Sequence, residues 1–137
     1  MRLLFAISFC SVAGVAAETV DVSGLPRPVE RRVDFATEIQ PIFDRSCLKC
    51  HGQKRPKSGY QMTSRSLSIM GGDLGAAIHP GDSARSPLVH YIAGLVEDME
   101  MPPEGKAPAL SRDEIALVRG WIDQGADWST RETTVTV

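Results

Sequence analysis

The sequence contains little of what usually stabilises a small domain. Only three of its 137 residues are cysteine, and aromatic residues make up 6%. No segment alternates apolar and polar residues over the length of a strand, which argues against a sheet. Basic and acidic residues nearly balance, at 15 and 17, so no excess of positive charge predicts binding to nucleic acid.

The longest apolar run lies near the N-terminus and is too short for a membrane span. Arg2 precedes the run from Leu3 to Val15, and Val15-Ala16-Ala17 provides the small residues of a cleavage site. A transmembrane helix needs roughly 20 apolar residues. Residues 1–17 are therefore predicted to be a signal peptide, with no membrane span in the mature chain and a periplasmic or equivalent extracytoplasmic location. Removing Arg2 from the 15 basic residues leaves 14 against 17 acidic ones, a net charge of −3.

The mature chain would keep two cysteines, which open the stretch CLKCHG at Cys47, Cys50 and His51. A single disulfide closing so small a loop would add little stability. Two thiolates and one imidazole fall short of a closed zinc site unless His79 or His90 adds a ligand. A thioredoxin-like redox pair lies near a strand–helix unit, and none is visible here. C-x-x-C-H is the attachment sequence of c-type haem, which the export prediction favours over the zinc and redox alternatives.

The spacing of this motif suits one covalently attached haem c. Residues three apart on a helix lie on the same side, so Cys47 and Cys50 can both reach one edge of the ring, and His51 can then bring its imidazole under the iron. A methionine opposite the histidine suits electron transfer. The stiff segment Met101-Pro102-Pro103 favours Met101 as that residue. Met99 remains an alternative, because in an extended segment it points to the same side.

Helical periodicity is expected in three segments. Phe35, Ile39, Ile42 and Phe43 form one face of a helix that begins near Asp34 and that Pro41 should kink or shorten. Further helices are expected over residues 86–95 and 111–125, with short helical turns near SRSLSIM, ended by Gly71-Gly72. The domain is predicted to span residues 34–128, between an exposed linker at 18–33 and a flexible tail at 129–137.

The last helix carries the clearest local signals. Ser111 and Glu114 match a capping box, and Gly125 should end the helix. Trp121 is expected in the core, packed against Phe35 and Phe43. The fold class is thus a small all-α domain with long loops wrapped around one haem.

Four pieces of the chain resemble the planctomycete-type cytochrome c domain. They are DFATEIQPIFDRSCLKCHG, GGDLGAAIHPGDSARSPLV, the MPP loop and LSRDEIALVRGWIDQGADW, in the order this family has. The resemblance implies a class I-like helical cytochrome c fold with a single haem. It also implies thioethers at Cys47 and Cys50, His51 as the proximal ligand and Met101 as the distal ligand. The run from Tyr60 to Thr63 departs from the family, which often has a Leu-Arg-Leu-Asp-like run there.

The expected function is that of an exported mono-haem carrier of single electrons between redox protein partners of unknown identity. No Ser-His-Asp set or acid pair stands out in the sequence, so no catalytic residue is assigned and the chain itself is not expected to be an enzyme. Two alternatives stay open. One is a haem-based sensor or ligand-binding module in which Met101 is displaceable, and the other is the haem-bearing subunit of an exported dehydrogenase complex.

Overall fold

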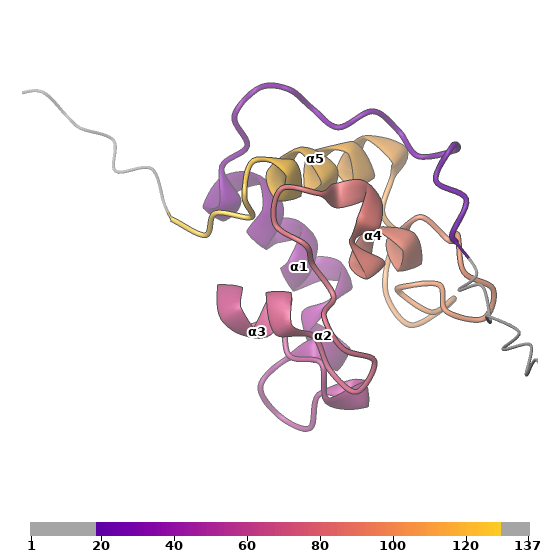
Figure 1. The fold of residues 1–137 in the computed structure, drawn as a ribbon. Coiled ribbons are helices and arrows are strands. Elements are labelled where there is room, and N and C mark those ends of the chain that lie inside the picture. Colours follow the sequence, from indigo (N-terminus) through magenta and orange to yellow (C-terminus); the bar gives the residue numbers. More distant parts are fainter. Residues whose placement is uncertain (1–18, 130–137) are drawn as a thin grey trace, which may run out of the picture.

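The computed structural model describes residues 19–129, which form a set of short helices without a strand (Figure 1). The only pairing of strand type among them is an isolated bridge between Gly72 and Gly75. The predicted all-α class is confirmed, whereas wrapping around a haem stays a prediction. The signal peptide at 1–17 and nearly all of the predicted tail lie outside the described residues. In chain order the elements are η1 (Phe35–Ile39), α1 (Gln40–Ser46), α2 (Leu48–His51), η2 (Lys57–Gly59), α3 (Arg65–Met70), η3 (Ser83–Arg85), α4 (Pro87–Ile92) and α5 (Arg112–Asp123).

The first helical segment begins at the predicted cap. The Asp34 carboxylate accepts a hydrogen bond from Thr37 N at 2.9 Å, as expected for an N-cap. A π-helical stretch, η1, runs to Ile39 before regular α1 begins. Pro41 lies in the first turn of α1, where its missing N–H has no intrahelical partner to lose. The expected break thus takes the form of a change in helix type.

The later helices also begin and end close to their sequence signals. Both hydrogen bonds of the capping box between Ser111 and Glu114 are present at the start of α5. Gly125 follows its end with φ of +105°, the left-handed conformation that glycine adopts without strain. Ser86 precedes α4, but its hydroxyl accepts a hydrogen bond from His79 N at 2.9 Å instead of capping the helix.

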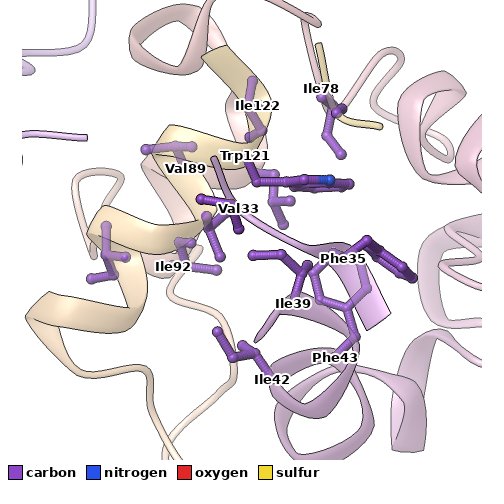
Figure 2. Packing of buried hydrophobic residues seen from close by; sticks show 14 of the residues in the cluster. Val33, Phe35, Ile39, Ile42, Phe43, Ile78, Val89, Ile92, Trp121 and Ile122 are labelled. Atoms are coloured by element: carbon purple, nitrogen blue, oxygen red, sulfur yellow. The ribbon is translucent and has the colours of Figure 1, made fainter. Parts of the chain in front are cut away.

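The core lies between η1–α1 and α5 (Figure 2). Trp121 is 2% exposed, and its ring centroid lies 5.6 Å from that of Phe35 and 5.7 Å from that of Phe43. This is the predicted packing of the last helix on the first. Trp128 adds a ring that the sequence did not single out, with its centroid 3.8 Å from that of Phe35.

The N-terminal segment corrects one expectation. Residues 18–33 are predicted to be an exposed linker, yet Leu25, Pro26 and Val33 are buried, and Figure 1 shows this indigo segment running along α5. Val29 N donates to Ala116 O at 3.1 Å. The expected exposure is therefore wrong for the buried residues, because the apolar side chains of this segment have a helix to pack on. The boundary between residues 33 and 34 stays a prediction.

Candidate cofactor site

A cavity of about 290 Å³ lies beside α2 and α4 and is lined mostly by apolar groups. All four residues predicted to bind a cofactor line it, although they come from parts of the chain 50 residues apart: Cys47, Cys50, His51 and Met101. The remaining wall is formed by residues drawn from 46–49, 57–62, 72–77, 87–92 and 99–107. The fold therefore brings the Cys-Cys-His motif and the Met-Pro-Pro loop to one apolar space.

The two cysteines are half-buried free thiols in this cavity. Cys47 N donates to Phe43 O, and Cys50 N donates to Cys47 O, so both cysteines lie on consecutive helical turns. Burial raises the pKa of the Cys47 thiol to about 12, against the opposing effect of Arg45. A buried thiol that stays protonated is a poor redox nucleophile. Within residues 19–129, no group of three or more His, Cys, Asp and Glu side chains could hold a metal ion.

The orientation of His51 is set by a backbone carbonyl. Its Nδ1 lies 2.9 Å from Tyr60 O. A carbonyl oxygen only accepts hydrogen bonds, so Nδ1 carries a proton, and in the neutral ring the lone pair is then on Nε2. Met62 N donates to His51 O at 2.8 Å and fixes the backbone of the same residue. This is the tautomer that a metal-ligating imidazole needs when Nε2 is the ligand.

Both methionines that the sequence left in competition line the cavity. Met101 is half-buried and packs against the core cluster, and its N–H donates to Tyr91 O at 3.0 Å. Met99 is also half-buried but is not part of that packing, and its N–H donates to Val96 O at 3.2 Å. The Met101–Pro102 peptide bond is cis. Contact with the core restrains Met101 more than Met99 and favours Met101 as the distal ligand. The choice between the two methionines stays a prediction.

The other histidines lie away from this cavity. His90 Nε2 is hydrogen-bonded to Ala84 O at 2.7 Å, and His79 is exposed and does not line the cavity. Sequence reasoning missed two tyrosines that do line it, Tyr60 and Tyr91. Tyr60 could have been noticed, because it begins the run that departs from the family pattern. Nothing in the sequence distinguishes Tyr91 from an ordinary apolar residue of α4.

Comparison with known proteins gives three results. Residues 47–105 match the family model described as Planctomycete cytochrome C. Hydrazine synthase subunit alpha from Kuenenia stuttgartiensis is 29% identical over 135 residues, covering 78% of this chain and 17% of that protein. A solved structure of Kuenenia stuttgartiensis hydrazine synthase is 25% identical with a TM-score of 0.46, covering 72% of this chain and 16% of that one. The chain spans about a sixth of the length of these relatives.

A cytochrome c family implies a covalently bound haem c, and the residues present fit such a group. The cavity offers two thiols for thioether bonds, an imidazole with a free Nε2 and a thioether side chain on a loop. No helix among residues 19–129 is long and apolar enough to cross a membrane. Residues 47–105 are thus similar to the planctomycete cytochrome c family that the sequence resembles.

Proposed function

We propose that this protein is an exported electron carrier whose Cys47 and Cys50 hold one haem c, with His51 and Met101 as axial residues. The observation that supports this most strongly is that these four residues line one largely apolar cavity. When bound, a haem c supplies a one-electron couple whose potential the protein tunes. The surrounding residues exclude water from the cavity and hold the two axial side chains in place.

His51 and Met101 are held by different means. The imidazole is fixed through Nδ1 by Tyr60 O at 2.9 Å, which raises its basicity as a ligand. Met101 is tied by its backbone N–H to Tyr91 O at 3.0 Å in α4. If the two side chains held a haem iron, the imidazole and thioether pair would raise its reduction potential and suit electron transfer. This arrangement suits transfer of an electron without binding of a further ligand.

The first experiment tests covalent attachment. Protein matured with haem is extracted with acid–acetone and its intact mass is measured. We expect the haem to stay on the chain and the mature protein to begin at Glu18. Complete extraction of the haem, or zinc in its place, would contradict the proposal.

The second experiment uses two matched methionine variants. Met101→Ala should remove the weak long-wavelength absorption of the oxidised protein and lower the potential, whereas Met99→Ala should change neither. The reduced wild-type protein should bind carbon monoxide poorly, and Met101→Ala should bind it readily. Ready binding by the wild type would favour a sensor, and damage from Met99→Ala would assign the axial role to Met99.

A second candidate function is that of a haem-bearing domain of a larger oxidoreductase assembly. It is favoured by the similarity to one sixth of hydrazine synthase subunit alpha, a subunit of an enzyme. Under this proposal the cavity residues play the same roles, and the chemistry lies in a partner. Purification from the source organism would distinguish the two, because a subunit should co-purify with partner chains whereas a carrier should not.

A further inference from the structure

The side chain of Tyr60 links His51 to helix α3. Its hydroxyl donates to Ser68 O at 2.9 Å, and its own carbonyl accepts from His51 Nδ1 at 2.9 Å. The rings of Tyr60 and His51 lie with centroids 5.1 Å apart. One residue thus contacts the imidazole with its backbone and holds a neighbouring helix with its side chain.

The backbone on both sides of the Tyr60 carbonyl is held by hydrogen bonds. Tyr60 N donates to Lys57 O at 3.1 Å, and two residues later Met62 N donates to His51 O at 2.8 Å. Between these bonds, the tyrosine side chain gives the residue that carries this carbonyl a further anchor. That anchor is the bond to Ser68 O. Burial, with a smaller effect of Cys47, raises the pKa of the Tyr60 hydroxyl, so the hydroxyl remains a donor at neutral pH.

We propose that Tyr60 is a positioning residue for His51. Its hydroxyl fixes the place of the Tyr60 carbonyl, and the carbonyl fixes the rotation of the imidazole and the strength of the Nδ1–H bond. This inference rests on the proposed function, in which His51 Nε2 is an axial ligand. A firm Nδ1–H bond makes the imidazole a stronger electron donor, which favours the oxidised state and lowers the reduction potential. The leucine that the family often has here could not supply this tether.

The test compares Tyr60→Phe with Tyr91→Phe in the haem-loaded protein. Tyr60→Phe keeps the ring and the carbonyl and removes only the tether. Tyr91 is the other tyrosine of the chain and lines the same cavity, so its variant controls for loss of a hydroxyl there. In Tyr60→Phe we expect a higher potential and about fivefold faster solvent exchange of the His51 Nδ1 proton in NMR spectra, the effect of weakening one hydrogen bond. Tyr91→Phe should leave that exchange at the wild-type rate.

Three results would overturn the inference. The first is solvent exchange of the His51 Nδ1 proton at the wild-type rate in Tyr60→Phe. The second is an equal acceleration of this exchange in Tyr60→Phe and Tyr91→Phe. The third result is measured on the wild-type protein and applies even if Tyr60→Phe fails to fold. A Tyr60 hydroxyl proton that exchanges with solvent as fast as the Tyr91 hydroxyl proton would exclude the hydrogen bond to Ser68 O. A wild-type protein that carries no covalent haem would be a different failure, because it contradicts the proposed function and this inference with it.

Discussion

Replacing Gly120 by alanine should detach the N-terminal segment from α5. A Cβ atom at this position would lie 2.5 Å from Val29 Cγ2 and 2.6 Å from Val29 O. The side chain could rotate away, but the carbonyl can move only if the segment moves. That movement would break the bond from Val29 N to Ala116 O and strain the bond from the Arg119 guanidinium to Pro26 O.

The size of the effect follows from these bonds. Losing the backbone bond and weakening the charged one costs about 2–4 kcal/mol. Alanine in a helix interior is better than glycine by about 1 kcal/mol, which offsets part of that loss. We expect Gly120→Ala to lower the free energy of unfolding by about 1–3 kcal/mol.

Urea unfolding of the haem-loaded protein measures this difference in stability. Limited trypsin digestion shows where the chain has loosened, because the cleavable residues Arg31 and Arg32 lie in the segment. Gly24→Ala is the matched control, since a Cβ there would meet nothing within 4 Å. The optical spectrum should be unchanged in both variants, because no residue of 19–33 lines the cavity. Equal stability and equal digestion of the two variants would refute the packing argument.

Two further substitutions, Ser68→Ala and Glu114→Gln, test one buried and one half-buried polar side chain. The Ser68 hydroxyl is fully buried and has no hydrogen-bond partner among the described residues, so Ser68→Ala should leave thermal stability unchanged or raise it by up to about 1 kcal/mol. Ser83→Ala is the control and should destabilise the protein, because the Ser83 hydroxyl is hydrogen-bonded to Asp123 and Arg119. Equal losses of stability in the two variants would show that the Ser68 hydroxyl also has a partner. Burial raises the pKa of Glu114, but hydrogen bonds from Ser111 and Arg45 outweigh it and hold the pKa below its ordinary value. Its charge therefore stabilises the fold above about pH 4.5, and this contribution is lost as the pH falls through the lowered pKa. Glu114→Gln should cost about 0.5 kcal/mol at pH 7 in unfolding experiments, and this cost should shrink as the pH falls through the lowered pKa of Glu114; a difference independent of pH would exclude the charge as its cause.

Local sequence signals predicted the parts of the fold that depend on neighbouring residues. The caps at Asp34 and Ser111 and the stop at Gly125 each involve residues within a few positions, so the sequence contains the whole interaction. Likewise, Cys50 and His51 lie in α2 and Cys47 immediately precedes that helix, so their close spacing in the sequence already indicates that they lie together.

The remaining features depend on contacts between distant residues. Arg119 and Pro26 are 93 residues apart, as are Gln124 and Arg31, and no local pattern marks such pairs. The role of Tyr60 also escaped prediction, because it depends on a carbonyl eight residues away in α3. The choice between Met99 and Met101 is unsettled for a related reason, since both side chains reach the same cavity.

The ring contact between Phe35 and Trp128 has a consequence for how such a unit can be joined to other proteins. With centroids 3.8 Å apart, the two residues bring the beginning and the end of the predicted domain, residues 34–128, close together in the fold. A unit whose ends meet can be inserted into a loop of a larger chain without stretching either the host or the guest. A junction at these ends would leave the cavity intact, because neither Phe35 nor Trp128 lines it.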